Sequence, residues 1–279
     1  MLPVVRLLTF ALAALAIQDQ VAFSRDIATL LMNSTFEIAG PDAAPGKETS
    51  GTIFLLGKPV KGEPNRAYFV LVTAAHVLNA ISGDHAMLFL RRRNGDGNYT
   101  VIPTQIEIRH NGTNLYVKNP DADVAAMYVP IPEGTAFDLL PMVFLADDAR
   151  LTRLEMHPGD ELQCLGFPLA ISLNGFPVIR SGLLASYPIT PTKVVRQLYY
   201  NFHTFPGNSG GPVYFSFFNR VYGGSTHLGD TEQGIIGLVS QQVTSRLPGY
   251  ESTPLDISII VPSSYIIDTI DMLPDTPPR

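Results

Sequence analysis

A serine set among glycines is the feature of this sequence that most directly suggests chemistry. The run from Gly207 to Val213 reads Gly-Asn-Ser-Gly-Gly-Pro-Val, with Ser209 third in it. A hydroxyl is a weak nucleophile at its ordinary pKa, so it needs a nearby base and donors for the oxyanion that its attack creates. Glycines let the backbone bend tightly enough for amide hydrogens to converge. We therefore predict a nucleophile at Ser209 and an oxyanion hole formed by the amides of Gly207 and Ser209.

A histidine and an aspartate earlier in the chain are the candidates to activate this serine. His76 follows Val-Thr-Ala-Ala, where a β-rich run ends in small residues. Asp123 directly precedes the apolar run Val-Ala-Ala-Met-Tyr-Val. A carboxylate at such a place can hold an imidazole in one tautomer and stabilise the imidazolium formed during reaction. Asp121 competes for this role, and Asp123 is preferred because it abuts the apolar run. Either residue alone is more often structural.

Together the three motifs resemble those of the trypsin-like (chymotrypsin-fold) serine peptidases. Their order is His, Asp, Ser, as in that family, with separations of 47 residues (76 to 123) and 86 residues (123 to 209). The resemblance covers about residues 25 to 272, but only the motifs are specific. It implies that His76 takes the proton of Ser209 and gives it to the leaving amine, while Asp123 orients His76. It also implies a serine endopeptidase acting through an acyl-enzyme on Ser209.

The same resemblance suggests where a protein or peptide substrate binds. The segment Gly-Leu-Val-Ser-Gln-Gln is similar to the family's strand beside the substrate, so the backbone around Ser240 and Gln241 should pair with it. His203 lies six residues before Ser209, where trypsins carry an acid at the base of the specificity pocket. A requirement for Arg or Lys at the cleavage site is therefore not expected. His203 with Thr204 would instead receive an acidic side chain, unless His203 faces elsewhere.

Some residues depart from the pattern of zymogen-activated trypsins. Asn208 replaces the aspartate that receives a new N-terminal ammonium, and Cys164 is the only cysteine, so no intrachain disulfide forms. The chain is thus closer in style to disulfide-free bacterial trypsin-like, HtrA-like or glutamyl-endopeptidase-like proteases, active without a second cleavage. About 70 residues follow Ser209, and the second barrel uses nearly all of them, so no PDZ domain is expected. Cys164 lies in an apolar run and is predicted to be a buried thiol.

Short β-rich runs separated by Gly- and Pro-bearing turns must position these residues. Two comparable sets of about six runs predict an all-β fold of two six-stranded antiparallel barrels. The resemblance to the trypsin-like peptidases implies that these barrels have the double Greek-key topology of the chymotrypsin type. We expect the first barrel within residues 25–135 and the second within 150–272. The one helix expected is terminal: residues 262–273 place apolar side chains on one face, after Ser263 or Ser264 as cap.

Composition excludes several classes of protein. Hydrophobic residues make up 46% of the 279 residues and charged residues 16%, which favours a packed chain over a disordered one. The net charge is −6, and no Lys/Arg run exceeds Arg91 to Arg93, so nucleic acid is not an expected partner. The histidines lack metal-ligand spacing, and no metal or cofactor is expected.

The first residues resemble a signal peptide. Arg6 precedes an apolar stretch from Leu7 to Ile17, which is too short for a comfortable membrane span. The small-x-small pattern ending at Ala16 predicts cleavage near that residue, with residues 1–17 as the leader. The protein is then expected to be secreted or periplasmic, without a stable membrane span after cleavage. A retained anchor or a packed N-terminal helix are the alternatives.

Two other functions fit part of the sequence. The motif around Ser209 also matches the G-x-S-x-G of α/β-hydrolases, which would make the chain an esterase-like serine hydrolase. That fold places its histidine after its serine and needs helices between parallel strands, whereas His76 precedes Ser209. The second alternative is a catalytically inactive binding protein with a protease fold, whose usual signature is a missing triad member.

Overall fold

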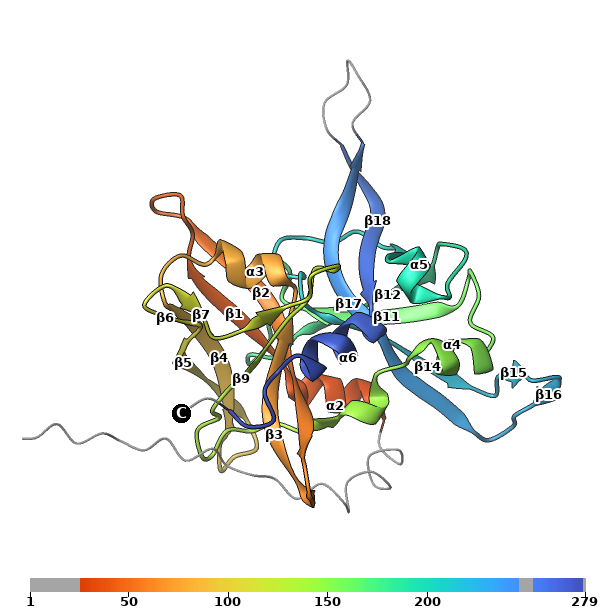
Figure 1. Cartoon of the computed structure of the whole chain (residues 1–279), viewed down its shortest axis with the longest axis horizontal. Coiled ribbons are helices and arrows are strands. Elements are labelled where there is room, and N and C mark those ends of the chain that lie inside the picture. Colours follow the sequence, from red (N-terminus) through yellow and green to blue (C-terminus); the bar gives the residue numbers. More distant parts are fainter. Residues whose placement is uncertain (1–25, 246–252, 278–279) are drawn as a thin grey trace, which may run out of the picture.

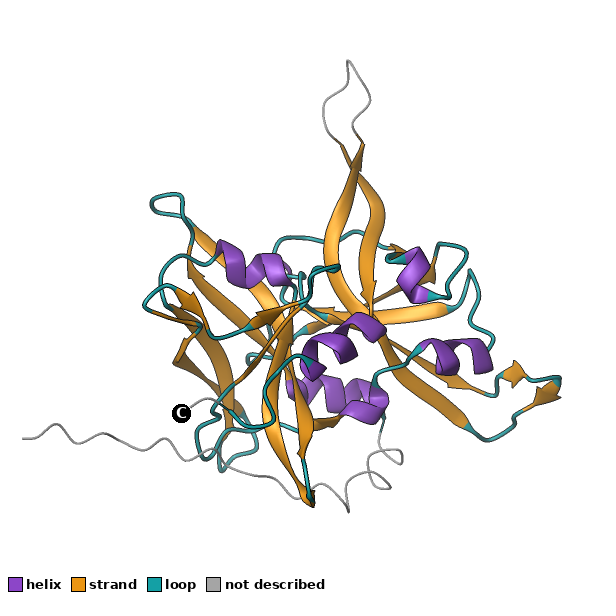
Figure 2. Cartoon of the chain, viewed as in Figure 1, coloured by secondary structure: helices purple, strands orange, loops and turns teal. Residues whose placement is uncertain are grey.

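A computed structural model describes residues 26–245 and 253–277. The chain forms two β units that lie side by side, the earlier one orange to yellow and the later one green to blue (Figure 1). Strands dominate, and short helices lie between and beside them (Figure 2). The predicted leader, residues 1–17, lies outside the described residues, so cleavage and export stay predictions. Among the described residues, no helix is long and apolar enough to cross a membrane.

The first unit is a sheet of eight strands around one apolar core. Its hydrogen-bonded path is β5-β4-β1-β2-β3-β9-β8, antiparallel throughout, and β10 pairs in parallel with β2. The prediction was six strands, and the two extra ones, β8 and β10, are only two residues long. The strands are β1 (Thr35–Pro41), β2 (Glu48–Val60), β3 (Glu63–Thr73), β4 (His85–Arg93), β5 (Tyr99–Glu107), β8 (Val117–Lys118), β9 (Ala125–Tyr128) and β10 (Leu140–Pro141).

The second unit is a closed barrel of six strands, which confirms the predicted fold class. Its order is β11-β12-β13-β18-β17-β14, and each described pair of neighbours is antiparallel. Cys164 is buried in β11 as predicted, and burial raises the pKa of its thiol to about 12. The strands are β11 (Glu161–Gly166), β12 (Val178–Leu184), β13 (Leu198–Asn201), β14 (Pro212–Phe218), β17 (Thr231–Ser245) and β18 (Thr253–Pro262). Short hairpins add β6 (Arg109–His110) with β7 (Thr113–Asn114), and β15 (Val221–Tyr222) with β16 (Ser225–Thr226).

The predicted terminal helix is present as α6 (Ser263–Asp271). The predicted serine cap is not: Pro262 is the N-cap residue, and the Ser263 hydroxyl donates to the carbonyl of Ala146 instead. Four further short helices were not predicted, because helices of this length carry little periodicity of their own. They are α2 (Ile27–Ser34), α3 (Ala75–Ala80), α4 (Asp148–Arg153) and α5 (Thr192–Val195), with 3₁₀ turns η1 (Met142–Phe144) and η2 (Pro168–Ala170).

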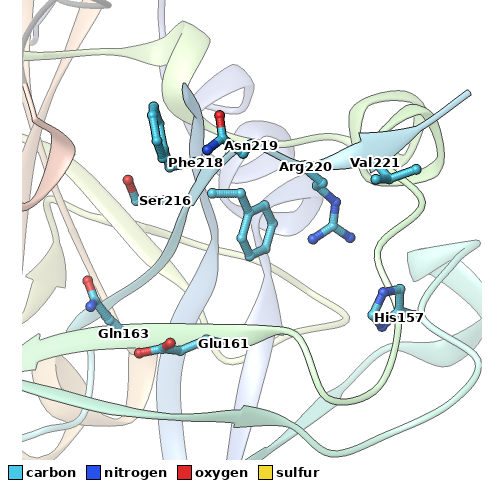
Figure 3. Close-up of a pocket in the computed structure, with 9 residues that line it drawn as sticks. His157, Glu161, Gln163, Ser216, Phe218, Asn219, Arg220 and Val221 are labelled. Atoms are coloured by element: carbon cyan, nitrogen blue, oxygen red, sulfur yellow. The ribbon is translucent and has the colours of Figure 1, made fainter. Parts of the chain in front are cut away.

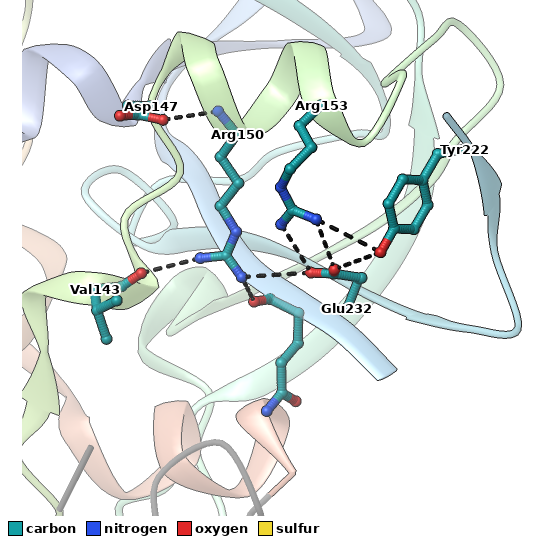
Figure 4. Close-up of polar contacts among 7 residues, drawn as sticks. Val143, Asp147, Arg150, Arg153, Tyr222 and Glu232 are labelled. Carbon is teal, nitrogen blue, oxygen red and sulfur yellow. Dashed lines mark hydrogen bonds and ion pairs between the residues drawn. The ribbon is translucent and has the colours of Figure 1, made fainter. Parts of the chain in front are cut away.

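An ion-pair network ties the connection between the two units to the second barrel (Figure 4). Arg150 of α4 donates to the carbonyls of Val143 and Gln233. Arg153 lies 3.0 Å from the carboxylate of Glu232, which also accepts the hydroxyl of Tyr222 at 2.9 Å. The first residues of β17 are therefore bonded to the connection that precedes the barrel. The division into residues 25–135 and 150–272 stays a prediction.

Candidate active site

His76 and Asp123 meet on the first sheet. β3 ends at Thr73 and α3 begins at Ala75, so His76 leaves the sheet at the start of a helix. Its backbone N–H donates to Asp123 Oδ1 at 2.9 Å, and its Nδ1 lies 2.7 Å from Asp123 Oδ2. Because an ionised carboxylate can only accept, Nδ1 is the nitrogen that donates to Asp123, and in the neutral imidazole the lone pair is then on Nε2. Asp121, the competing acid, is exposed and does not bond to His76.

Asp123 is held from both units. The hydroxyl of Ser240, on β17, donates to Asp123 Oδ2 at 2.6 Å. Burial opposes the ionisation of Asp123, but the hydrogen bonds from His76 and Ser240 outweigh it and hold the pKa of this carboxyl below its usual range. The carboxylate is therefore charged at neutral pH. The sequence indicated a backbone role for Ser240 but not this side-chain bond.

Ser209 is partly exposed and lies just before β14. Its hydroxyl donates to the carbonyl of Ser240 at 3.0 Å, and in the described part of the chain no hydrogen bond joins it to His76. Its own carbonyl accepts from the N–H of Thr52 on β2 at 2.8 Å. Ser240 thus connects the three predicted residues, since its hydroxyl binds Asp123 and its carbonyl binds Ser209.

The backbone at Gly207 presents free donors next to the serine. The Pro206 carbonyl accepts from Leu169 N at 2.8 Å, and the Gly207 carbonyl accepts from Thr52 Oγ1 at 2.6 Å. The C=O and N–H of a trans peptide point in opposite directions, so the Gly207 N–H points away from Leu169. Among the described residues, neither the Gly207 nor the Ser209 N–H has an acceptor.

Only glycine fits at position 207. Its φ is +96°, and a Cβ there would lie 2.1 Å from the carbonyl oxygen of Phe167. The anchors of this peptide, Thr52 and Leu169, were missed by sequence reasoning because neither residue type nor spacing signals them. Asn208 is buried, and its Nδ2 has no hydrogen-bond partner among the described residues.

The predicted specificity residues are bonded within the protein. His203 Nδ1 lies 3.0 Å from Asp256 Oδ1, and its ring packs 4.5 Å from that of Phe205. Both the N–H and the hydroxyl of Thr204 donate to Gln242 Oε1, at 2.5 and 2.8 Å. The structure therefore adds Gln242 and Asp256 to this region, neither of which sequence reasoning identified.

Two open clefts mark the described surface. One, of about 660 Å³, borders the site and includes Asp121 and Asp123 with Ala75 of α3 and Val261 of β18. The other, of about 460 Å³, lies between the ends of β11 and β14 (Figure 3). It includes His157 and Arg220 but none of the predicted site residues. Arg220 there donates two 2.8 Å hydrogen bonds to the buried Asp160, so its charge is paired within the protein.

The structure has two β units, with His76 and Asp123 on one and Ser209 on the other, which is the arrangement that the resemblance to the trypsin-like serine peptidases implies. No family profile matches the chain, and no curated protein matches it.

Solved structures of serine proteases are similar to the chain at low sequence identity. The serine endoprotease from Yersinia pestis is 13% identical over 88% of this chain and 64% of its own, with a TM-score of 0.48. The Rv3671c protease from M. tuberculosis, in its active form, is 15% identical over 100% of this chain and 96% of its own, with a TM-score of 0.49. The protease Anisep from Arthrobacter nicotinovorans is 16% identical over 85% of this chain and 94% of its own, with a TM-score of 0.48. The chain thus spans less than two thirds of the Yersinia protein.

Proposed function

We propose that the chain is a serine endopeptidase that cleaves peptide bonds through an acyl-enzyme on Ser209. The observation that carries this proposal is the set of contacts of Ser240, which links the His76–Asp123 pair to the serine hydroxyl across the two units. A serine nucleophile also needs donors for the oxyanion, and the free N–H groups of Gly207 and Ser209 would be these donors.

In the proposed reaction the Ser209 hydroxyl turns from the Ser240 carbonyl to His76 Nε2, which accepts its proton as Oγ attacks the substrate carbonyl. The N–H groups of Gly207 and Ser209 bind the resulting oxyanion. His76 then protonates the leaving amine as the C–N bond breaks, leaving the acyl-enzyme. Water attacks the ester, again losing a proton to His76, and Ser209 recovers that proton as the acid leaves. Asp123 stays ionised and stabilises each imidazolium.

The substrate backbone is proposed to extend the second barrel along β17. β14 pairs with β17 only from Thr231 to Leu238, whereas β18 continues to pair with it up to Ser245. The edge of β17 opposite β18 is therefore without a strand partner from Ser240 onward in the described chain. An extended peptide added at this edge would place its carbonyl carbon beside Ser209, whose hydroxyl already contacts the Ser240 carbonyl.

A fluorophosphonate probe with mass-spectrometric mapping tests the nucleophile. We expect the probe to modify Ser209 in the folded protein and not the exposed Ser216. Incubation with a denatured protein as substrate tests whether peptide bonds are cleaved, since an endopeptidase creates new amino termini within the substrate. Ester hydrolysis without new amino termini would favour the esterase alternative. Absence of both labelling and hydrolysis in folded protein would favour the inactive binding protein and overturn the proposal.

We further propose that the enzyme prefers a small, uncharged residue before the cleaved bond. The Gln242 side chain reaches from β17 to Thr204, across the space between the substrate-pairing strand and the segment that precedes Ser209. Thr204 has its N–H and hydroxyl occupied, and His203 faces the carboxylate of Asp256, which would repel an acidic substrate side chain. The acidic preference considered from the sequence therefore receives no support from these contacts.

Removal of the Gln242 side chain should widen this preference. In Gln242→Gly, we expect kcat/KM for substrates with a large apolar residue before the cut to rise by about 10- to 100-fold relative to alanine substrates, because the side chain no longer fills the space. A peptide-library cleavage profile measures this ratio. Gln242→Glu retains the length and the acceptor for Thr204, so it should still exclude large side chains. An unchanged ratio in Gln242→Gly would contradict the assignment.

A further inference from the structure

Arg91, on β4, is a fully buried arginine without a carboxylate partner among the described residues. Its guanidinium lies between the rings of Phe36 and Phe176, 4.1 and 4.2 Å from their centroids. Burial lowers its pKa to about 9, so it stays charged at neutral pH. A buried charge is costly unless its donors are satisfied. Here backbone carbonyls bind both terminal nitrogens and two aromatic rings lie against the guanidinium in place of a counter-ion, while Nε has no hydrogen-bond partner among the described residues.

The carbonyls that Arg91 binds come from both units. Three belong to the end of α2 and the start of β1, namely those of Met32, Asn33 and Thr35, at 2.9 to 3.0 Å. The fourth, at 2.7 Å, belongs to Gly175 in the loop that joins β11 to β12 in the second barrel. This loop, residues 167–177, is thus docked onto the first unit at its far end.

The near end of the same loop holds the candidate oxyanion hole. Leu169 N binds the Pro206 carbonyl, and the Phe167 carbonyl lies against the backbone of Gly207. Between the two anchored ends, Ile171 and Leu173 are 57% and 78% exposed. Because the middle of the loop is so exposed, the path of its backbone depends on the contacts that hold its two ends. Arg91 makes the contact at one of these ends.

We propose that Arg91 is a positioning residue for the oxyanion hole. By docking the 167–177 loop onto the first unit, it keeps Leu169 bonded to the Pro206 carbonyl, which points the Gly207 N–H toward the oxyanion. Release of the loop would let the 206–207 peptide turn and withdraw one of the two donors. This inference rests on the proposed peptidase function.

A substitution at Gly175, which contacts Arg91 from the loop, tests this proposal most directly. Gly175 has a φ of +77°, and a Cβ there would lie 2.6 Å from Val101 Cγ2 and 3.2 Å from Arg91 Cγ. Gly175→Ala should therefore lift the loop from the first unit while Arg91 remains. Gly112→Ala is the matched control, because Gly112 has a φ of +76° and nothing within 4 Å of its would-be Cβ. Both variants carry the same backbone strain, and only one displaces the loop.

We expect Gly175→Ala to lower kcat by about 10- to 100-fold, since loss of one oxyanion donor costs up to about 1,000-fold. KM should change by less than about twofold, because the donor acts mainly in the transition state. Active-site titration below the melting temperature corrects for unfolded protein. Arg91→Met should have the same effect, with Arg220→Met, which removes a largely covered arginine paired with Asp160, as a control for loss of an arginine elsewhere. If Arg91→Met does not fold, Gly175→Ala decides alone.

The two proposals fail in different ways. If the wild-type protein neither labels with fluorophosphonate nor cleaves peptides, the proposed function is wrong. If the wild type is active but Gly175→Ala matches Gly112→Ala in kcat, or raises KM alone, the role of Arg91 is overturned while the peptidase assignment stands.

Discussion

Ser209→Ala is expected to lower kcat for peptide hydrolysis by about 10⁶-fold, the loss that removal of a triad nucleophile causes elsewhere. The reason is that the proposed acyl-enzyme cannot form without Oγ, while the proposed oxyanion donors and the proposed substrate-pairing edge of β17 remain. KM should therefore change far less than kcat. Initial rates on a fluorogenic peptide, chosen from the cleavage profile, measure the effect.

Ser216→Ala is the matched control, because Ser216 lies on the same strand, β14, and is exposed. It should retain wild-type kcat and melting temperature. Ser209→Ala should also keep the wild-type melting temperature, since Ser209 contacts Thr52 through its backbone carbonyl, which the substitution preserves. A Ser209→Ala enzyme with activity within about tenfold of the wild type would exclude Ser209 as nucleophile.

Asp123→Asn is expected to lower kcat by about 10⁴-fold, as the equivalent change does in other triads. In the wild-type protein, Asp123 accepts hydrogen bonds from the His76 backbone N–H, from His76 Nδ1 and from the Ser240 hydroxyl. An amide in this place can donate to Nδ1, which would move the imidazole proton to Nε2 and remove the base that Ser209 needs. Asp121→Asn is the control and should leave kcat unchanged. Equal losses in both variants would contradict the assignment of Asp123.

Asp123→Asn should also change how the free energy of unfolding depends on pH. Hydrogen bonds hold the pKa of Asp123 in the folded protein below the value of about 3.9 expected when unfolded. The carboxylate therefore contributes stability above that pH and loses it as the pH falls through the folded-state pKa. The difference in free energy of unfolding between the wild type and Asp123→Asn should be largest near neutral pH and shrink below about pH 4. Denaturant melts from pH 7 to pH 2 measure it.

The amino-acid sequence by itself determined the strand-rich class of fold, the six-stranded second barrel and the terminal helix. It also indicated Ser209, His76 and Asp123 as the residues to examine. The fold predictions succeed because turn residues and β-branched runs act through local backbone preferences, which neighbouring residues reveal. The preference for Asp123 over Asp121 rested on the apolar run that follows, and Asp123 is the one of the two that bonds to His76. The catalytic roles of the three residues stay predictions.

The tertiary structure alone decided what surrounds those residues. Thr52 anchors Gly207 across 155 positions, and Arg91 binds Gly175 across 84. The bond from the Ser240 hydroxyl to Asp123 likewise joins the two units, whereas the bond from Ser209 to the Ser240 carbonyl joins distant segments of the second barrel. Gln242 bonds to the N–H and hydroxyl of Thr204, and Asp256 bonds to Nδ1 of His203, neither of which the sequence indicated. Such contacts depend on how the strands of one barrel close and how the two β units pack, and neither residue type nor spacing encodes which group a distant side chain will meet.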